Sequence, residues 1–476
     1  MFFFLAFLVF NLLTANRYPI VWIDEVQHTD PAANLYFGNG FTSTAWSTQT
    51  SGEFWAGNVP LHSALLFLWI NLFGFSLGAV RSINYVYMVA ALLLVWRATV
   101  RLNLVQTARS RLILLVLLVC GYSMIFSYSS GRYDCLGMLI VAGMFYAHTV
   151  KKSWQKMASM FTLSFIAPWA GLQLLPLVAV GAVMMLLFLG RRPSGKFLVA
   201  VTGAAAGTVG LALFYAVHGV LKKFLGAIRP VTTIGLFEAL VKGHYYHSNR
   251  LPKDFSFWPI FALALLLFVF LARRGLLHRR SPLVFGLLYS ICVSAALVFS
   301  GRFPTYYGWM IYAPLCVCVC ATLSEVPLSA ALRRTSAVAL GASIVLGVLL
   351  HGAAAVYNWP DRDYNNVIRL VNESVTNTDN MCGDWATYYA AKTVVHKLYL
   401  PLYLPMRLEN ERRQLTVLVI APRYFAPVTA AVGGEWVPTG QRFVPKHHGF
   451  LGTKLNMGFL TGDYELAVYR RAEPSL

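Results

Sequence analysis

Residues 17–41 read RYPIVWIDEVQHTDPAANLYFGNGF and directly follow an apolar run that begins MFFFLAFLVF. Two neighbouring acids, Asp24 and Glu25, therefore stand where the first apolar run ends. They sit at the membrane surface, and an ionisable pair at such a place is a functional-site hypothesis by default. Asp30 has a different interpretation, since an acid before Pro31 is typical of a helix N-cap and first turn.

The composition of the 476-residue chain indicates a membrane environment. Hydrophobic residues make up 57% of the chain and charged residues 12%. An average soluble protein has a charged fraction of roughly 25%. A chain so poor in charge cannot cover a water-facing surface of this size. The composition excludes a disordered protein and predicts a polytopic α-helical membrane protein.

Apolar runs of about 20 residues are long enough to span a bilayer as helices, and the sequence contains about eleven of them. An alternative for the first run is a cleaved signal peptide. It fits poorly, because no basic residue precedes the run and no clear cleavage site follows it. The expected spans lie near residues 2–16, 82–97, 112–130, 134–150, 157–172, 174–190, 197–217, 255–272, 283–300, 308–325 and 335–356.

The net charge of +20 arises from 39 Lys and Arg against 19 Asp and Glu. Much of this excess lies in short connections between the expected spans, and the positive-inside rule places such connections in the cytoplasm. They alternate consistently if the N-terminus is cytoplasmic and the C-terminus is outside the inner or plasma membrane. The distribution of charge therefore predicts the membrane topology of the chain. Because it accounts for much of the positive excess, no nucleic-acid partner is predicted. The residues are Arg97, Arg101, Arg109, Arg111, Lys151, Lys152, Lys156, Arg191, Arg192, Lys196, Arg273, Arg274, Arg279, Arg280, Arg333 and Arg334.

The remaining segments are expected on the extracytoplasmic side. Two outer loops cover residues 17–81 and 218–254, and the apolar segment 60–75 of the first is expected at the outer interface of the bilayer. The C-terminal segment alternates strand-like runs, such as LTVLVIAP and YELAVYR, with helix-like ones. We expect a membrane domain over residues 1–356 and a small extracytoplasmic α/β domain over residues 357–476.

The third expected span ends in FSYSSGRYDCLGM. This stretch brings Arg132 and Asp134 to the same outer boundary as Asp24. Carboxylates from distant parts of the chain therefore meet at one face of the membrane. The alternative interpretation is that Arg132 and Asp134 only pair with each other across a tight turn.

The order of these features resembles the GT-C superfamily of membrane glycosyltransferases, in particular the protein O-mannosyltransferases and the lipid A aminoarabinose transferases. The resemblance covers residues 1–150, and the later spans and C-terminal domain agree in architecture only. One departure concerns Asn58, Val59 and Pro60, because many relatives have Lys-Pro-Pro there, which puts a lysine contact to the donor phosphate in doubt. The matching features are Asp-Glu at 24–25, the amphipathic VPLHSALLFLWINLFG, Ala-Val-Arg at 79–81, an Arg-rich inner loop and Arg-x-Asp at 132–134.

The resemblance implies a polyprenyl-phosphate sugar donor that is used on the extracytoplasmic face, with a glycan, lipid or protein as acceptor. It also implies catalytic roles for the acids after the first and third spans, which are Asp24 and Asp134. Glu25 is predicted with them, either as a further catalytic acid or as a metal ligand. Some relatives bind a divalent metal ion near these acids, and membrane lipids are expected partners of the bundle.

The chemistry of sugar transfer fits these residue types. An acceptor hydroxyl is a poor nucleophile, so a carboxylate within hydrogen-bond reach helps as general base, and Asp24 is the candidate. A second carboxylate can stabilise the oxocarbenium-like transition state. The leaving phosphate favours Arg, Lys or a metal ion. The resemblance and this chemistry together lead us to expect an inverting glycosyltransferase.

Four basic residues are candidates for the donor phosphate. Arg302 is the first choice, because a basic residue in the outer turn SGRFPTYYGWM, followed by aromatic residues, resembles the GT-C pattern that meets the lipid phosphate. The other candidates are Arg132, Lys242 and Arg250. The alternative for the basic residues of the loop 218–254 is contact with anionic lipid headgroups.

The same outer segments contain histidines and aromatic residues with separate interpretations. His244 and His247 have the i, i+3 spacing that lets two side chains on a helix share a metal ion, with Glu25 as a further possible ligand. The aromatic residues after Arg302 are expected to form an interfacial belt. These are Tyr306, Tyr307 and Trp309.

A competing interpretation is a transporter or flippase for a polyprenyl lipid or another solute. Such a protein would place ionisable residues at mid-depth in the bilayer and would contain broken helices and a pseudo-symmetric repeat. The expected spans are almost free of ionisable residues at their centres, which favours chemistry at the membrane surface. A non-catalytic membrane scaffold is a third possibility, but it gives no reason for Asp24 and Asp134.

Overall fold

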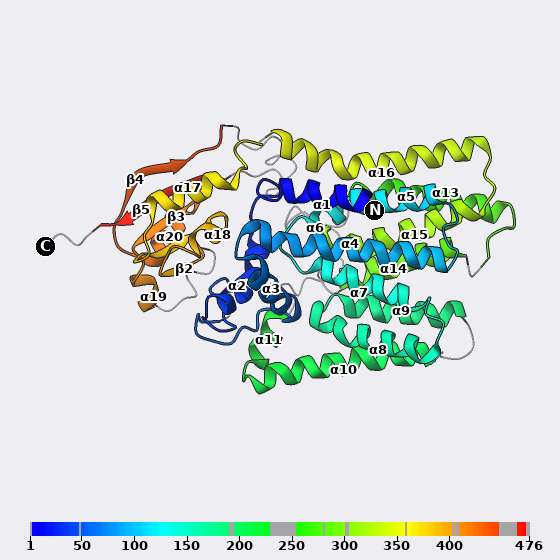
Figure 1. Cartoon of the computed structure of the whole chain (residues 1–476), viewed down its shortest axis with the longest axis horizontal. Helices are drawn as coiled ribbons and strands as arrows, with labels where there is room; N and C mark the ends of the chain where they lie inside the picture. Colours follow the sequence, from blue (N-terminus) through cyan, green and yellow to red (C-terminus); the bar gives the residue numbers. More distant parts are fainter. Residues whose placement is uncertain are drawn as a thin grey trace.

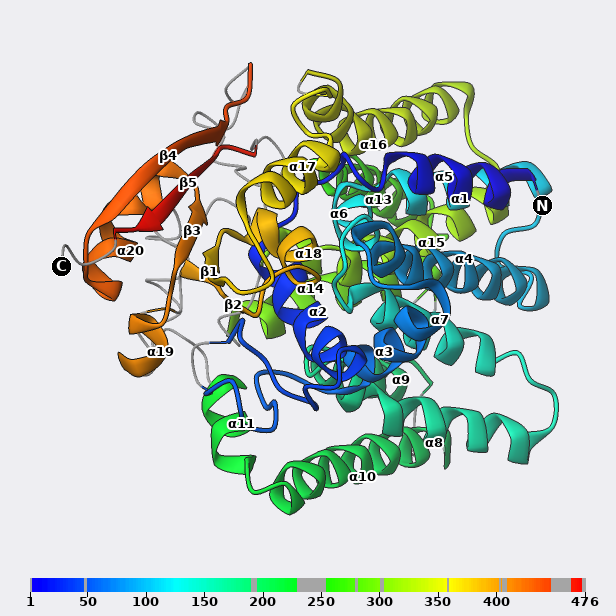
Figure 2. The ribbon, with the colours of Figure 1, turned by 60° about the vertical axis from the view of Figure 1, so that its left-hand side comes forward.

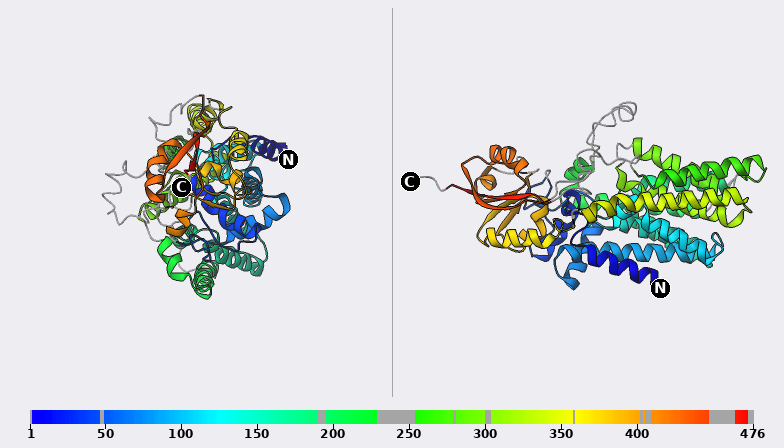
Figure 3. Two further views of the ribbon diagram at one scale, coloured as in Figure 1. Left: turned by 90° about the vertical axis from the view of Figure 1, so that its left-hand side faces the viewer. Right: turned by 90° about the horizontal axis from the view of Figure 1, so that it is seen from above.

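The helices of the protein form an elongated bundle that carries a smaller α/β domain at one end (Figure 1). Figure 3 shows the bundle helices running side by side along the long axis of the molecule. The short helices α2 (Ile23–Tyr36) and α3 (Leu61–Phe73) lie between the two parts. The computed structural model describes residues 2–46, 49–189, 195–228, 254–278, 281–299, 304–357, 359–401, 404, 409–446 and 464–472.

Each apolar run expected from the sequence coincides with a helix of the bundle. By length and composition, 4 helices in the described ranges can cross a membrane, or up to 5 if a bent pair counts as one span. The larger count of spans stays a prediction. The bundle helices are α1 (Phe2–Thr14), α4 (Leu77–Arg101), α5 (Ala108–Cys120), α6 (Tyr122–Tyr128), α7 (Asp134–Ala147), α8 (Ser153–Ala170), α9 (Leu174–Leu189), α10 (Gly195–Val217), α13 (Phe257–Arg273), α14 (Pro282–Phe299), α15 (Trp309–Glu325) and α16 (Ala330–Tyr357).

The run expected as the third span is broken into α5 and α6, which are bent by 65°. Gly121 lies at the break, and a Cβ atom there would come within 2.4 Å of the Tyr312 side chain on α15. At the same place α16 approaches closely, because a Cβ atom at Gly347 would lie 1.9 Å from the carbonyl oxygen of Cys120. Close packing at the break therefore redirects the chain into α6, which leads to the turn that carries Arg132.

The described residues of the connections rich in Lys and Arg lie at the end of the bundle away from the C-terminal domain (Figures 1 and 2). Arg101, Lys151, Arg273 and Arg333, one from each of four connections, are exposed there. This separation agrees with the alternation expected from the charge pattern. The assignment of that end to the cytoplasm stays a prediction.

The C-terminal domain contains a five-stranded sheet in the order β2-β1-β3-β5-β4 (Figure 2). β1, β2 and β3 are parallel, and β5 pairs antiparallel with β3 and β4. The strand-like runs LTVLVIAP and YELAVYR contain β3 and β5. The elements are α17 (Tyr364–Ser374), β1 (Asn380–Gly383), α18 (Tyr388–Ala391), β2 (Lys397–Tyr399), α19 (Glu409–Arg413), β3 (Val417–Ile420), α20 (Phe425–Val432), β4 (Trp436–Phe443) and β5 (Leu466–Arg471).

The helices between the bundle and the sheet are short. α3 packs its buried Leu66 and Ile70 into the core shared with α2, while Leu68 and Leu72 on its other face are exposed. An exposed apolar face of this kind suits a bilayer interface. α11 (Leu221–Ile228) follows α10 at the same end of the bundle.

Glycines allow α8 and α10 to pack very closely. A Cβ atom at Gly207 would lie 2.1 Å from the carbonyl oxygen of Phe165, and one at Gly203 would lie 2.6 Å from that of Phe161. Small residues four apart let membrane helices approach in this way. In contrast, a Cβ atom at Gly181 on α9 meets nothing within 4 Å.

We expect Gly207→Ala to destabilise the protein and Gly181→Ala to leave it unchanged or slightly more stable. Both changes gain about 0.5–1 kcal/mol of helix propensity, but the first forces two helix backbones apart at a cost of about 1–3 kcal/mol. The measurement is the thermal unfolding midpoint of the purified protein in detergent. Equal midpoints for the two variants would contradict the close approach of α8 and α10.

Candidate active site

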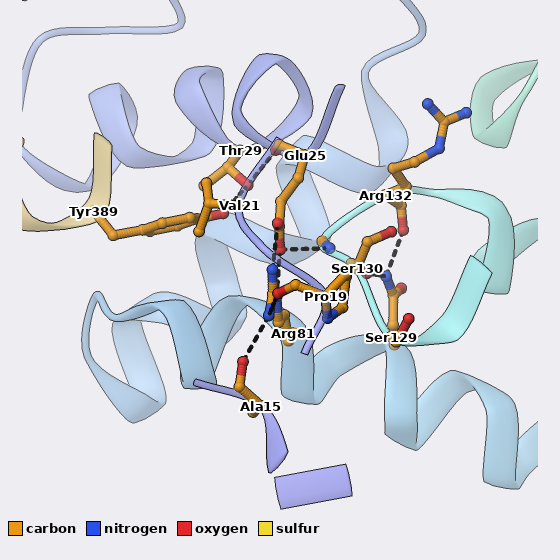
Figure 4. A network of polar contacts seen from close by, with 12 residues as sticks. Ala15, Pro19, Val21, Glu25, Thr29, Arg81, Ser129, Ser130, Arg132 and Tyr389 are labelled. Carbon is orange, nitrogen blue, oxygen red and sulfur yellow. Dashed lines mark hydrogen bonds and ion pairs between the residues drawn. The ribbon is translucent and has the colours of Figure 1, made fainter. Parts of the chain in front are cut away.

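Glu25 and Arg81 form a fully buried ion pair where α2 meets α4 (Figure 4). Arg81 Nε donates to Glu25 Oε1 at 2.7 Å, and Arg81 Nη2 donates to Glu25 Oε2 at 2.7 Å. Arg81 Nη1 also donates to the carbonyl oxygens of Ala15 and Pro19, at 2.6 and 2.9 Å. The guanidinium therefore fixes the loop that connects α1 to α2, as well as the glutamate itself.

Glu25 also fixes the turn between α6 and α7. The backbone N–H of Gly131 donates to Glu25 Oε1 at 2.9 Å, and a Cβ atom at Gly131 would lie 3.0 Å from Glu25 Cγ. Asn84 Nδ2 donates to the carbonyl oxygens of Ser130 and Arg132, both at 2.5 Å (Figure 4). The backbone of Arg132 is thus held from α2 and α4 together.

The side chain of Arg132 joins two acids that are far apart in sequence. Its Nε donates to Asp134 Oδ2 at 2.8 Å, and its Nη1 pairs with Asp24 Oδ2. Arg132 and Asp134 are buried, whereas 25% of the Asp24 side chain is exposed. The structure therefore brings the predicted residues Asp24, Arg132 and Asp134 into one cluster in which Asp24 is accessible.

Aromatic side chains surround the guanidinium of Arg132. Its Cζ lies 3.8 Å from the ring centroid of Tyr306 and 5.4 Å from that of Trp22, which are cation–π distances. The Tyr306 hydroxyl donates to Asp24 Oδ2 at 3.4 Å. The expected interfacial belt of Tyr306, Tyr307 and Trp309 is wrong, because Tyr307 and Trp309 are buried and Tyr306 packs against the cluster.

His28 lies on α2 next to this cluster, with its ring centroid 4.6 Å from that of Tyr133. Burial, together with the nearby Arg132 and His62, holds the pKa of His28 well below its usual range. The imidazole is therefore neutral at pH 7 and does not add positive charge to the site.

Asp30 is not the helix N-cap that the sequence suggests. α2 begins at Ile23, so Asp30 lies in its interior, fully buried. Lys392 and Tyr388 of the C-terminal domain donate to Asp30 Oδ1 at 2.8 and 2.7 Å, and Ser43 donates to Oδ2 at 2.7 Å. Burial alone would raise the pKa of Asp30, but Lys392 and these hydrogen bonds outweigh it and lower the pKa. The N-cap prediction fails because the true partners are distant in sequence.

Several predicted site residues lie outside the described residues. They are Arg302, Lys242, Arg250, His244 and His247. Their roles at the donor phosphate or at a metal ion stay predictions.

The surroundings of Glu25 do not suit a metal ligand. Its Oε1 accepts hydrogen bonds from Arg81 and Gly131, and its Oε2 accepts one from Arg81. Within the described ranges, no group of three or more His, Cys, Asp or Glu side chains is placed to hold a metal ion. The predicted divalent metal is therefore not assigned to the described part of the cluster.

Sequence reasoning missed the part played by Arg81, Asn84 and Tyr306. Arg81 carried a usable signal, because it stands at the outer end of an expected span, where the charge rule disfavours a basic residue. Asn84 is a buried polar residue in the same helix and needs hydrogen-bond partners. Nothing in the sequence distinguishes Tyr306 from the aromatic residues next to it.

Solved structures with a similar fold exist although the sequences have diverged. ArnT from Cupriavidus metallidurans bound to undecaprenyl phosphate is 11% identical, with a TM-score of 0.58 over 99% of both chains. The same protein in the apo state is 12% identical, with a TM-score of 0.56 over 99% of this chain and 98% of that one. No family model matches the chain, and no curated protein sequence matches it.

The arabinofuranosyltransferase AftD from Mycobacteria is also similar. It is 15% identical, with a TM-score of 0.52 over 99% of this chain and 40% of AftD. At such low identities the likeness concerns the fold. The chain has the fold of ArnT and AftD, and the fold that the resemblance to the GT-C superfamily implies is confirmed.

We expect Glu25→Gln to destabilise the protein by about 3–5 kcal/mol, because removing one partner of a buried ion pair leaves the other charge uncompensated. Glu53→Gln is the matched control, since Glu53 pairs with Lys223 and is 33% exposed. That change should cost about 1 kcal/mol or less. The measurement is the midpoint of thermal or denaturant unfolding in detergent. An inactive Glu25→Gln protein of wild-type stability would contradict the structural role and favour a catalytic one.

Proposed function

We propose that the protein is an inverting glycosyltransferase that moves a sugar from a polyprenyl-phosphate donor to an acceptor hydroxyl, with Asp24 as general base. The observation that carries this proposal is the cluster of Asp24, Arg132 and Asp134. Its two inner members are buried and its outer carboxylate is accessible. Arg132 fixes the position of the accessible Asp24 carboxylate, and a fixed carboxylate within hydrogen-bond reach of a bound hydroxyl can remove its proton.

The similar structures support the class of donor. ArnT was solved with bound undecaprenyl phosphate, and AftD is named as an arabinofuranosyltransferase. Both share the fold in which the cluster sits. A lipid-linked donor also suits a site at the junction between an apolar bundle and a domain with polar surfaces. The proposed acceptor is a hydroxyl group of a glycan, lipid or protein.

The proposed reaction is a single displacement. The acceptor oxygen bonds to the anomeric carbon while its proton passes to the Asp24 carboxylate. The bond between the anomeric carbon and the donor phosphate oxygen breaks, and its electron pair leaves with the phosphate. Attack from the side opposite the leaving group inverts the anomeric configuration. Positive charge that develops on the sugar is stabilised by the Asp24 carboxylate, which is the accessible acid of the cluster.

The buried acids have positioning roles in this proposal. Asp134 holds Arg132, which in turn holds Asp24. Glu25 holds the Arg132 backbone through Gly131 and binds Arg81. Both were predicted as catalytic, and their burial supports an action through neighbouring groups.

The leaving phosphate requires cations at the same boundary. Arg132 is one candidate, and Arg302, Lys242 and Arg250 are proposed with it from the sequence. His244 and His247 stay the proposed ligands of a divalent metal ion, which would supply further positive charge. The described residues do not form such a site, so no step is assigned to a metal.

The proposed face of the reaction is extracytoplasmic. The cluster lies at the end of the bundle that carries the C-terminal domain, and the exposed basic connections lie at the other end (Figure 1). By the positive-inside rule the basic end faces the cytoplasm. The site and the C-terminal domain would then face outward.

We expect Asp24→Asn to lower sugar transfer by about 10²–10⁴-fold without unfolding the protein, because the amide cannot accept the hydroxyl proton. Asp363→Asn is the matched control. Asp363 pairs with Arg17, has a similar exposed fraction of 22%, and caps α17, where asparagine serves equally well. The measurement is consumption of a panel of polyprenyl-phosphate sugars by the purified protein, followed by mass spectrometry.

Two results would contradict the proposal. Transfer by Asp24→Asn at the wild-type rate would exclude Asp24 as the base. Movement of intact donor across a vesicle membrane, with no sugar released from phosphate by the wild-type protein, would favour a flippase.

A further inference from the structure

The C-terminal domain forms buried hydrogen bonds on both sides of Asp24 in the sequence. The Tyr464 hydroxyl accepts from the backbone N–H of Val21 at 3.1 Å. The Tyr389 hydroxyl lies 3.1 Å from Thr29 Oγ1, which itself donates to the carbonyl oxygen of Glu25 at 2.8 Å (Figure 4). Because the threonine proton is used in that second bond, Tyr389 is the donor to Thr29. The two tyrosines thus bracket the first turn of α2.

A third contact holds the middle of α2. Lys392 and Tyr388 both donate to Asp30 Oδ1, and all three side chains are largely buried. Tyr388, Tyr389 and Lys392 belong to one short stretch at α18, so a single turn of the C-terminal domain contacts α2 at consecutive residues. The other carboxylate oxygen accepts from Ser43, which adds the outer loop to the same contact.

Apolar packing between the two parts is continuous with these hydrogen bonds. Val26 of α2 and Leu66 of α3 share one buried core with Val367 of α17 and Met381 of β1. A separate apolar cluster lies on the other face of the sheet and contains Leu418, with Tyr469 packed against it. The face of the sheet domain that meets α2 is therefore part of the same folded unit as the candidate active site.

α2 has few local features that would hold it in place. Its N-cap residue, Trp22, makes no side-chain capping bond, and Pro31 lies inside the helix. A helix of 14 residues is marginal without tertiary contacts, and an internal proline removes a backbone hydrogen bond. The position of Asp24 in the first turn therefore depends on contacts made by other segments.

We propose that the C-terminal domain is a positioning element of the active site, in which Tyr464, Tyr389 and Lys392 hold α2 so that Asp24 meets Arg132. The expected effect on sugar transfer rests on the proposed function, whereas the restraint of α2 by the C-terminal domain does not. The domain would act on the reaction through α2 and without touching the donor. Its removal or displacement would release the general base from its place beside Arg132.

The first test compares Tyr389→Phe with Tyr469→Phe. Each change removes one hydroxyl from the same domain, but Tyr469 packs on the opposite face of the sheet, with its ring 4.3 Å from that of Phe425. We expect Tyr389→Phe to lower kcat about tenfold while the donor KM changes by about twofold or less, because misplacement of the base affects the chemical step. Tyr469→Phe should match the wild type in both constants.

The second test is independent of any substrate. Hydrogen–deuterium exchange of the full-length protein in detergent reports how firmly the α2 amides are held. We expect exchange of the α2 amides to become about tenfold faster in Tyr389→Phe and to stay at the wild-type rate in Tyr469→Phe. If the wild type transfers no sugar from any donor, the proposed function fails. The hydrogen–deuterium exchange of the α2 amides then tests by itself whether the C-terminal domain holds α2.

A third test uses the ion pair with Asp30. Lys392→Arg keeps a cation within reach of the carboxylate and should keep kcat within about threefold of the wild type, whereas Lys392→Met should lower it about tenfold or more. The double variant Asp30→Asn with Lys392→Met removes both charges, so it leaves no buried charge without a partner. It replaces Lys392→Met in the test if that single variant does not fold. Wild-type exchange and wild-type kcat in both Tyr389→Phe and the double variant would overturn the positioning role.

Discussion

The buried ion pair of Glu25 with Arg81 is the constraint on which the candidate site depends. Burying two charges costs several kcal/mol each, and the attraction between them offsets this only when the remaining hydrogen-bonding groups also find partners. Here the partners are backbone groups of two separate segments, namely the loop after α1 and the turn at Gly131, while the ion pair itself joins α2 to α4. The charges are therefore satisfied only when the loop, the turn and the two helices occupy their observed places. The ion pair therefore fixes the backbone next to Arg132. The contact of the Arg132 side chain with Asp24 depends on that backbone position.

The two neighbouring acids divide their tasks because of helix geometry. Successive residues of an α-helix point about 100° apart, so Asp24 and Glu25 in the first turn of α2 cannot face the same space. Glu25 points inward to Arg81, while Asp24 points to Arg132 and is partly exposed. An acidic pair that looks like one functional unit in the sequence is therefore split between a structural and a proposed catalytic role. The split explains how one helix start can both fix the site and act in it.

The sequence predicts features that depend on local patterns and fails for features that depend on distant partners. Apolar length located the bundle helices, and the strand-like runs of the C-terminal segment located β3 and β5. Convergence of Asp24 with Arg132 followed from topology, since both stand at the outer ends of apolar runs. The N-cap interpretation of Asp30 failed because its partner Lys392 is 362 residues away. The surroundings of Tyr306 could not be predicted either. The local sequence does not distinguish an aromatic residue at the membrane interface from one that packs against a buried guanidinium.

The charge of the cluster limits what Arg132 alone can do for a leaving phosphate. Its guanidinium already pairs with Asp24 and with Asp134, so two carboxylates screen its field at any third anion nearby. A phosphate that gains negative charge as the sugar leaves would meet two acids and one shared cation. Transfer at this cluster therefore requires positive charge from a further segment. That requirement is why the basic residues predicted in the outer segments, with Arg302 first among them, belong to the same proposal as Asp24.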